Sequence, residues 1–463
     1  MVIGNPQRSR LNPDRQFLLQ HIHFDKPITR AQGHYLYDAQ GEAYLDFLAQ
    51  YGAVPFGHNP AIVWEALNRV RLNHEPSLVQ PLLSPAAEAL SAKLSAIAPV
   101  RNGYVTFTNS GAETVEAAIK LARAKTLRPY IVSASGGFHG KTLGAVSATW
   151  NPKYREPFLA DTRHFDFVPY GDVEALEARL AQGDVAAFLV EPVQGEAGMI
   201  DAPAGYLRAA AEICKRHRTL LIVDEIQSGL GRTGTLFALE HEGVTADMVL
   251  LAKALGGGMV SLGACICAEH AWSEEFGLFH SSTFANNHLS CAIGLAVIEH
   301  LLADDQALVR DVAEKGDYLR RGLEVLIRCH PRAFSHATGK GLMQGLHIHP
   351  WQHADSYFLC HASWTGMSVP LICGYLLNQH KIITVPTFNN NGVIRIEPSL
   401  TITHAEIDRL LDALDDVGEA IAQEDFAKLL RYLTGERGKV VHFPQIIEKG
   451  SEKHAEPQRA MSW

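Results

Sequence analysis

The stretch LLIVDEIQSGLGRTG, residues 220–234, begins with a continuous apolar run and passes at Asp224 into a segment rich in glycine and polar residues. A continuous apolar run of this length is typical of a strand that is covered on both faces. Helical patterns alternate with such runs, for example at 112–127 and 203–217. This alternation predicts an α/β fold with a mostly parallel sheet and helices on both faces. The other runs of this kind cover residues 130–134, 186–192, 248–252 and 263–267.

Polar or glycine-rich segments follow the predicted strands where those strands end. Ligand sites of parallel α/β sheets lie at the carboxyl ends of the strands. We therefore expect the functional residues in the four segments 135–142, 191–196, 224–234 and 253–258. Outside this region, residues 35–47 predict a hairpin with Gln40 and Gly41 in its turn.

Composition and charge exclude several classes of protein. Of the 463 residues, 47% are hydrophobic, which argues against a disordered chain. No apolar run is long enough to predict a membrane span. The net charge of −9, without a basic stripe, argues against nucleic acid as a partner. Seven cysteines, an odd number, and a polar N-terminus without a signal-peptide pattern predict a cytoplasmic protein.

Residues 109–113, Asn-Ser-Gly-Ala-Glu, precede an apolar helical stripe. The pair Ser110 and Glu113 has the spacing of a capping box. Gly111 and Ala112 leave the N–H groups of the first turn uncovered, which favours an anion-binding site. The alternative interpretation is an ordinary helix cap.

Asp224 and Lys253 follow two consecutive predicted strands. Lys253 lies between two alanines and precedes three glycines, a setting that suits a desolvated amine able to attack a carbonyl. A carboxylate at a strand end can keep a pyridinium nitrogen protonated. The alternative is a buried ion pair between the two residues. Phe138, after a glycine pair, could stack on a flat ring or belong to the core.

Together these motifs resemble those of the class III pyridoxal-phosphate aminotransferases of fold type I. The resemblance runs from about residue 30 to about residue 425. Within the family, the putrescine branch is most similar, followed by the ornithine and 4-aminobutyrate aminotransferases. The motifs that carry the resemblance are NSGAETVEAAIKLAR, FHGKTLGAVSAT, EPVQGEAG, VDEIQSGLGRTG, LLAKALGGG, HSSTF and VIRIEPSLTIT.

The resemblance implies a large domain, built on a mostly parallel but mixed seven-stranded sheet, and a smaller discontinuous α+β domain. We expect residues 1–60 to form the N-terminal part of the small domain and residues 61–335 the large cofactor-binding domain. Residues 336–430 would complete the small domain, and residues 431–463 would be a tail or linker.

The resemblance also implies roles around pyridoxal phosphate. Lys253 would form the Schiff base and shuttle a proton, and Asp224 would pair with the pyridinium nitrogen. Gln227 would lie near the phenolic oxygen, with Ile226 beneath the ring and Phe138 stacked above it. Further cofactor-binding residues would be His139 and the phosphate-binding Ser110, Gly111 and Ala112.

Thr283, in the motif HSSTF, would reach the phosphate bound to the neighbouring subunit. The resemblance therefore implies a homodimer with active sites at the interface. The alternative is that Thr283 is simply a loop residue.

Substrate selection is expected to depend on Glu196 and Arg395. In ornithine-type relatives the matching Glu and Arg pair with each other until the Arg is released to bind a carboxylate, a ligand that a guanidinium grips bidentately. A permanent salt bridge is the alternative. Lys141 stands where relatives that bind a second carboxylate usually carry Arg, which favours a donor without a distal carboxylate. Tyr51 would line the entrance, or be a buried tyrosine of the small domain.

Three features depart from the family or remain open. Residues 285–289 stand where the family usually has the sequence GGNPL. The aromatic stretch 350–372 could line a pocket for an amine larger than putrescine. Alternatively, this stretch forms a surface loop or an oligomer contact. A histidine-rich cluster at 347–361 fits no standard zinc pattern, so we expect no metal.

The expected reaction transfers nitrogen from an amine donor to an oxo acid such as 2-oxoglutarate, with ping-pong kinetics. The alternatives are a mutase, racemase or decarboxylase on the same fold, a biosynthetic aminotransferase for a larger apolar substrate, and a non-catalytic scaffold.

Overall fold

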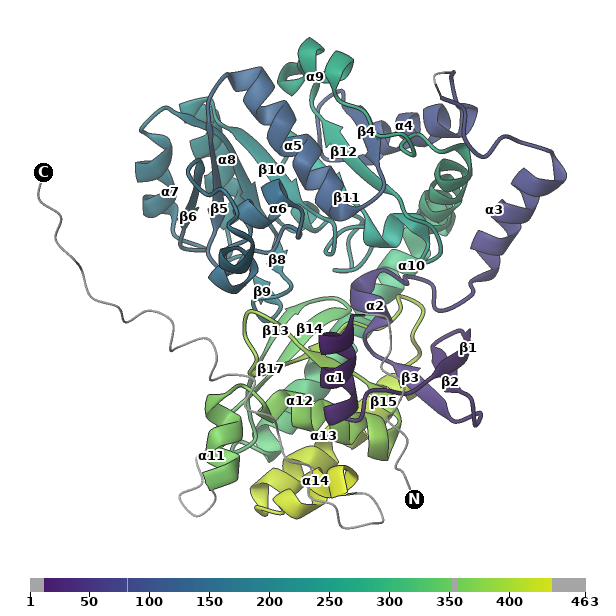
Figure 1. Cartoon of the computed structure of the whole chain (residues 1–463), viewed down its shortest axis with the longest axis vertical. Helices are drawn as coiled ribbons and strands as arrows, with labels where there is room; N and C mark the ends of the chain where they lie inside the picture. Colours follow the sequence, from purple (N-terminus) through teal and green to yellow (C-terminus); the bar gives the residue numbers. More distant parts are fainter. Residues whose placement is uncertain (1–11, 81, 352–356, 435–463) are drawn as a thin grey trace, which may run out of the picture.

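The computed structural model describes residues 12–80, 82–351 and 357–434. Its upper part, in the view of Figure 1, is built on one seven-stranded sheet with the strand order β4-β12-β11-β10-β7-β5-β6. β12 runs antiparallel to both of its neighbours, and the other pairs are parallel, which confirms the mixed, mostly parallel sheet. The strands are β4 Tyr104–Thr108, β5 Tyr130–Ala134, β6 Phe165–Val168, β7 Val185–Val190, β10 Leu220–Asp224, β11 Met248–Leu251 and β12 Gly263–Cys267.

The five predicted strands are all present, and the sequence patterns missed β4 and β6. These two strands form the edges of the sheet. Their residues are only partly buried, so their sequences lack the continuous apolar runs of the inner strands.

Helices pack on this sheet (Figure 1). The predicted helix at 112–127 is α5 Gly111–Thr126, and the predicted helix at 203–217 begins later, as α8 Tyr206–His217, after Gly205 with a φ of 82°. The others of this part are α3 Ala61–Leu72, α4 Pro85–Ile97, α6 Leu143–Ala148, α7 Val173–Leu180, α9 Glu274–Phe279, and the short helices η1 Pro152–Tyr154, η2 Glu156–Phe158, η3 Ala238–Glu242, η4 Lys253–Gly256 and η5 Glu269–Ala271.

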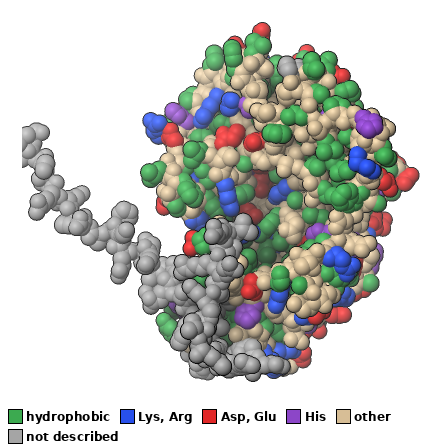
Figure 2. All heavy atoms as spheres, turned by 45° about the vertical axis from the view of Figure 1, so that its right-hand side comes forward, with side chains coloured by type: hydrophobic (Ala, Val, Ile, Leu, Met, Phe, Trp, Pro, Cys, Tyr) green, Lys and Arg blue, Asp and Glu red, His purple; other side chains and the backbone are tan. Residues whose placement is uncertain are grey.

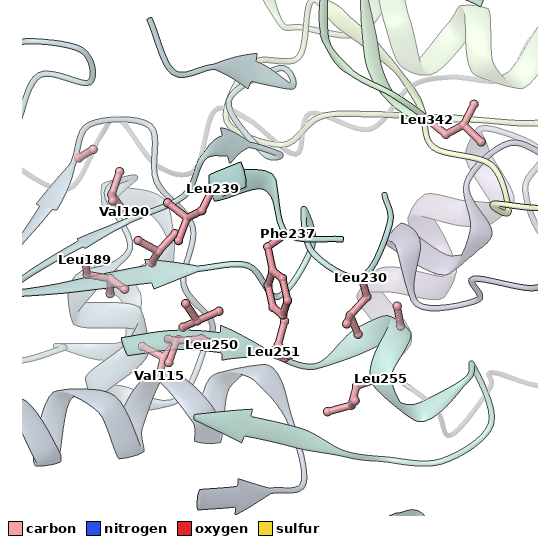
Figure 3. Close-up of a cluster of buried hydrophobic side chains, with 14 of the residues drawn as sticks. Val115, Leu189, Val190, Leu230, Phe237, Leu239, Leu250, Leu251, Leu255 and Leu342 are labelled. Atoms are coloured by element: carbon pink, nitrogen blue, oxygen red, sulfur yellow. The ribbon is translucent and has the colours of Figure 1, made fainter. Parts of the chain in front are cut away.

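The core of this part is apolar and continuous. Figure 3 shows side chains from α5, the inner strands and the following loops packed together, among them Val115, Leu189, Leu250 and Phe237. All four are at most 1% exposed. This packing fixes the carboxyl ends of β10 and β11, from which the candidate site residues project.

Two smaller sheets form the lower part of Figure 1. In the first, β15 Ile382–Ile383 pairs with β3, so segments from the two ends of the chain share one sheet. The predicted hairpin is present: its turn is closed by a hydrogen bond from the N–H of Gly41 to the carbonyl of Asp38 (3.1 Å). The strands of the two sheets are β1 Ile28–Gln32, β2 Tyr35–Asp38, β3 Ala43–Asp46 and β15, and then β13 Phe334–Lys340, β14 Met343–Ile348, β17 Val393–Ile396 and β16 Val385–Pro386.

The long helix α10 His288–Cys329 joins the upper and lower parts and is kinked at residues 303–306. The remaining elements are α1 Pro13–His21, α2 Ala49–Gly52, β8 Val193–Gln194, β9 Ile200–Asp201, α11 Tyr357–Trp364, α12 Ser368–Tyr375, the π-helical turn η6 Leu376–His380, α13 His404–Ala422 and α14 Phe426–Thr434.

The domain boundaries at 60, 335 and 430 stay a prediction. The last of them falls within α14, and the predicted tail lies outside the described residues from 435 onward. Within the described residues, no helix has both the length and the apolar character that crossing a bilayer requires.

Candidate active site

Asp224 and Lys253 lie at the carboxyl ends of two neighbouring parallel strands. Asp224 is the last residue of β10, in register with Leu250 of β11, and Lys253 begins η4 with a φ of 40°. Burial lowers the pKa of the Lys253 amine, against the opposing effect of the Glu397 carboxylate. Near pH 7, a larger fraction of such a desolvated amine is neutral than of an exposed lysine, and only the neutral amine can attack a carbonyl or take up a proton.

Asp224 does not form an ion pair with Lys253 within the described part of the chain. Instead, its Oδ2 lies 2.8 Å from Nδ1 of His139, and its Oδ1 accepts the N–H of Ile226 at 3.1 Å. Although burial opposes it, the Asp224 carboxylate raises the pKa of His139. The predicted alternative of a buried Asp–Lys pair is therefore wrong, and His139 holds the carboxylate in place.

Glu191 lies against the same group of residues. Its carboxylate accepts the N–H of Phe138 at 2.9 Å, and burial, with the nearby Asp224, raises the pKa of Glu191 to about 7. The sequence analysis did not single out Glu191, although it lies at the end of a predicted strand.

The start of α5 provides the expected anion site, with one correction. Ser110 is the N-cap, and its Oγ accepts the N–H of Glu113 at 3.2 Å. The Glu113 carboxylate accepts the N–H of Asn109 at 2.6 Å, not that of Ser110, so the predicted capping box is only half formed. A side chain at the next residue, Gly111, would bring its Cβ to 3.0 Å from Ile226. The start of α5, where the N–H groups of Gly111 and Ala112 have no partner among the described residues, therefore lies directly beside Ile226.

These residues fit a flat, phosphorylated pyridine cofactor. The bare first turn of α5, formed by Gly111 and Ala112 after Ser110, can bind a phosphate. Asp224 can pair with a ring nitrogen, and Lys253 offers an amine with a lowered pKa.

Aromatic rings and lysines line the side of the site near Phe138. The Phe138 ring lies edge-on to Tyr154, with centroids 5.7 Å apart. Nζ of Lys141 lies 5.3 Å from the Tyr154 ring centroid. Burial, with the nearby Glu196, raises the pKa of Tyr154 to about 12. Tyr154 was not predicted, because the short helix η1, in which it lies, carries no recognisable motif.

The two residues expected to select the substrate are in contact. Arg395 of β17 is fully buried, and its Nη2 lies 2.7 Å from Oε1 of Glu196. Although burial opposes it, Arg395 lowers the pKa of Glu196. The Tyr51 ring centroid lies 5.2 Å from Cζ of Arg395, so Tyr51 borders this pair.

Glu397 is a second carboxylate at this pair, which the sequence analysis missed. Its Oε2 lies 3.3 Å from Nη1 of Arg395, and its two oxygens accept Nε2 of Gln227 at 3.0 and 2.8 Å. A signal existed: Arg395 and Glu397 are two residues apart in a strand motif, a spacing that places both on one face. The role of Gln227 at a phenolic oxygen stays a prediction.

Thr283 lies in an exposed loop beside the start of α5. The neighbouring Ser282 accepts a hydrogen bond from Nδ2 of Asn109 at 2.9 Å within the same chain. The expected reach of Thr283 into a second subunit stays a prediction.

The aromatic stretch 350–372 is only partly described, because residues 352–356 lie outside the description. Trp351 is buried against Phe426 of α14, with ring centroids 5.3 Å apart, and α12 packs on β16 and β17. Its role in lining a pocket stays a hypothesis. Among the described residues, no group of histidine, cysteine or acidic side chains is arranged to hold a metal ion, and His353 of the predicted cluster lies outside them.

On the face shown in Figure 2, the surface is hollowed near the middle of the molecule, and both acidic and basic side chains are visible there. Asp224 ends β10 of the upper sheet, Lys253 begins η4 after β11, Glu196 follows β8, and Arg395 belongs to β17 of the lower part, so the site lies between these parts.

Comparison with known proteins places this site in a family. The model of the class III aminotransferase family matches residues 20–417. The chain is 38% identical to the putrescine aminotransferase of Pectobacterium atrosepticum, over 82% of this chain and 80% of the relative. It is 35% identical to the aminotransferase PigE of a Serratia species, over 89% of this chain but only 52% of the relative, so it spans about half of that protein.

Solved structures agree with the sequence comparison. The ornithine aminotransferase of Toxoplasma gondii, which has partial occupancy of pyridoxal phosphate, matches with a TM-score of 0.77 and 26% identity, over 90% of this chain and 96% of that one. The taurine:2-oxoglutarate aminotransferase of Bifidobacterium kashiwanohense, in complex with pyridoxal phosphate and glutamate, matches with a TM-score of 0.75 and 27% identity, over 86% and 93%. The chain therefore belongs to the class III aminotransferase family, whose cofactor is pyridoxal phosphate.

Proposed function

We propose that this protein transfers the amino group of an ω-amine, such as a putrescine-like diamine, to an oxo acid such as 2-oxoglutarate. The observation that carries this proposal is the contact between the buried guanidinium of Arg395 and the Glu196 carboxylate. A paired guanidinium accommodates an amine end that has no carboxylate. If Glu196 turns away, the same guanidinium can bind an acceptor carboxylate bidentately.

The lysine beside Phe138 and Tyr154 also favours this class of donor. Lys141 is exposed and presents a point charge, not the planar fork that would grip a second carboxylate. The similarity to a putrescine aminotransferase supports the same choice.

The residues that would surround the cofactor each have a task in this reaction. Bound pyridoxal phosphate supplies an electron sink for the carbon that carries the amine. Lys253 holds and moves the proton at that carbon, helped by the lowered pKa of its amine. His139 orients Asp224 through the 2.8 Å contact. Phe138 and Ile226 would hold the ring of the cofactor, and the start of α5 would bind its phosphate.

We also infer that the chain works as a homodimer in the cytoplasm. Cys214, Cys265, Cys267, Cys291 and Cys373 are buried and form no disulfide within the described residues, which suits a reducing compartment. The homodimer rests on the expected contact of Thr283 with the neighbouring active site.

The test is a screen of amine donors with 2-oxoglutarate and pyruvate as acceptors. Each product, glutamate or alanine, is measured together with the loss of donor. Glutamate formed from 2-oxoglutarate and a diamine supports the proposal. Donor consumption without any amino-acid product would contradict it and favour the decarboxylase, racemase or mutase alternatives.

A further inference from the structure

Glu397 is a buried carboxylate that the proposed function leaves without a task. It is fully buried and directly contacts the residue that selects the substrate, with Oε2 at 3.3 Å from Nη1 of Arg395. Nε2 of Gln227 donates to both of its oxygens. A buried carboxylate is retained only where such partners stabilise its charge.

The surroundings of Glu397 hold it in one position. Its backbone N–H donates to the carbonyl of Phe47 at 2.8 Å. Gly52, with a φ of 78°, leaves just enough room for Oε1, because a Cβ at that residue would collide with it. Glu196 differs, since 12% of its side chain is exposed and its second oxygen binds a loop N–H, that of Phe388. Glu397 is therefore the fixed carboxylate of the two.

The three nitrogen atoms of the Arg395 guanidinium have different surroundings. Nη1 faces Glu397, Nη2 faces Glu196, and the buried Nε has no hydrogen-bond partner within the described residues. The edge formed by Nε and Nη2 is therefore the one that a substrate carboxylate can occupy when Glu196 leaves. At that moment Glu397 still neutralises the guanidinium.

The net charge of the cluster around Arg395 depends on the position of Glu196. With both carboxylates in place, the cluster of Arg395, Glu196 and Glu397 has a formal charge of −1, and with Glu196 turned away it is neutral, not positive. A carboxylate then meets a half-neutralised guanidinium, whereas a distal ammonium meets a surplus of negative charge. Charge pairs buried this deeply change binding strongly, because the medium screens them weakly.

We propose that Glu397 is a specificity-determining residue that acts through Arg395: it favours donors that end in an ammonium group over donors that end in a carboxylate. This inference deepens the proposed amino transfer and rests on it. It adds a second, immobile carboxylate to the Glu196–Arg395 pair.

The experiment compares two four-carbon donors that differ only in the distal group, putrescine and 4-aminobutyrate. In Glu397→Gln, which removes the charge and keeps the shape, the ratio of kcat/KM for putrescine to that for 4-aminobutyrate is expected to fall about tenfold or more. Glu397→Asp, which keeps the charge, is expected to retain most of the wild-type preference. If the Asp variant shifts the ratio as far as the Gln variant, packing and not charge is responsible and the proposal fails.

A binding measurement tests, without turnover, whether the Glu397 charge weakens the binding of a carboxylate. Glutarate, a dicarboxylate without an oxo group, is titrated into the cofactor-loaded protein by calorimetry. We expect it to bind Glu397→Gln about tenfold more tightly than wild type. Equal or weaker binding would overturn the inference even if the wild-type enzyme transfers amino groups as proposed. Conversely, wild type that forms no amino-acid product refutes the proposed function, while the glutarate titration still tests Glu397.

Two further variants complete the design. Glu225→Gln is the matched control, because Glu225 is equally buried but binds backbone N–H groups and Ser228, away from Arg395. It is expected to leave the donor ratio and glutarate binding unchanged, and a shift as large as that of Glu397→Gln would contradict the proposal. Glu397→Asn, also uncharged, replaces the Gln variant in both measurements if thermal melting shows that the Gln variant does not fold.

Discussion

At the scale of single residues, the proposed chemistry uses an amine and a guanidinium whose pKa values are shifted in opposite directions. Burial lowers the pKa of Lys253, whereas Glu196 and Glu397 outweigh burial and raise the pKa of Arg395. The first group can therefore release its proton near neutral pH more readily than an ordinary lysine, and the second stays charged throughout.

Replacing Lys253 by Ala is expected to lower the rate of amino transfer by about 10³-fold or more, because the variant loses both the attachment point and the proton shuttle. The rate is measured as glutamate formed from 2-oxoglutarate with the best donor of the screen. Lys215→Ala, at an exposed position of α8, is the control and should retain the wild-type rate. Full turnover by Lys253→Ala would show that the assignment is wrong.

Arg395→Lys keeps the charge but removes the fork that grips a carboxylate. We expect KM for 2-oxoglutarate to rise about tenfold or more, while single-turnover reaction of the loaded enzyme with the amine donor changes much less. Stopped-flow spectroscopy separates the two half-reactions. An equal loss of rate in both half-reactions would mean that the Glu196–Arg395 pair is only structural.

At the scale of elements, the helix α13 begins with a complete capping box, in contrast to α5. Thr403 Oγ1 accepts the N–H of Glu406 at 3.3 Å, and the Thr403 N–H donates to the Glu406 carboxylate at 2.9 Å. Thr403→Ala should therefore lower the free energy of unfolding by about 1 kcal/mol. Urea titration measures it. Thr126→Ala, which removes a hydroxyl that donates to a carbonyl within α5, serves for comparison and should lower the free energy of unfolding less.

The strand β14 contains a buried histidine that makes stability depend on pH. Burial, together with His336 stacked at 3.9 Å, lowers the pKa of His347 from 6.5 to about 4. In the unfolded chain His347 therefore binds a proton below about pH 6.5, whereas in the folded protein it binds one only below about pH 4. Stability contributed by neutral His347 is fully present above pH 6.5 and is lost as the pH falls toward 4.

Urea unfolding of wild type and His347→Gln at pH 7 and pH 4.5 tests this linkage. The drop in the free energy of unfolding between the two pH values should be smaller in His347→Gln, because the variant has no proton to bind at this position. His404→Gln, at the exposed start of α13, is the control and should show the wild-type drop. An unchanged drop in His347→Gln would refute the prediction.

At the scale of the whole molecule, we expect a homodimer in which each chain contributes Thr283 to the other's active site. Light scattering on the loaded protein should give twice the chain mass. Mixing Lys253→Ala chains with Thr283→Ala chains should then restore activity, because half of the sites in a mixed dimer combine an intact lysine with an intact threonine. After full exchange of subunits we expect about a quarter of the wild-type rate. A mixture no more active than the two variants measured separately would place Thr283 in its own chain's site, or outside any site.

How much the sequence predicts depends on how local the signal is. The inner strands β10 and β11 were predictable because strands covered on both faces need continuous apolar runs. The edge strands β4 and β6 were not, because their partly buried residues lack that pattern. The first turn of α5 was predictable as an anion site from four consecutive residues. The second hydrogen bond of its capping box was not predictable, because the Glu113 carboxylate accepts the N–H of Asn109 and not that of Ser110.

By itself, the sequence determined the family and the α/β sheet, and it identified Lys253, Asp224, Glu196 and Arg395 as candidate site residues, because motifs and strand patterns consist of residues that are neighbours in the chain. Only the tertiary structure decided the partners of these groups. Asp224 pairs with His139 across 85 positions of the chain, and Gln227 binds Glu397 across 170. Such pairs arise from the order of strands in the sheet and from the approach of the lower part to its carboxyl edge. Local sequence cannot encode them, since burial and charge at a site are set by every segment that packs around it.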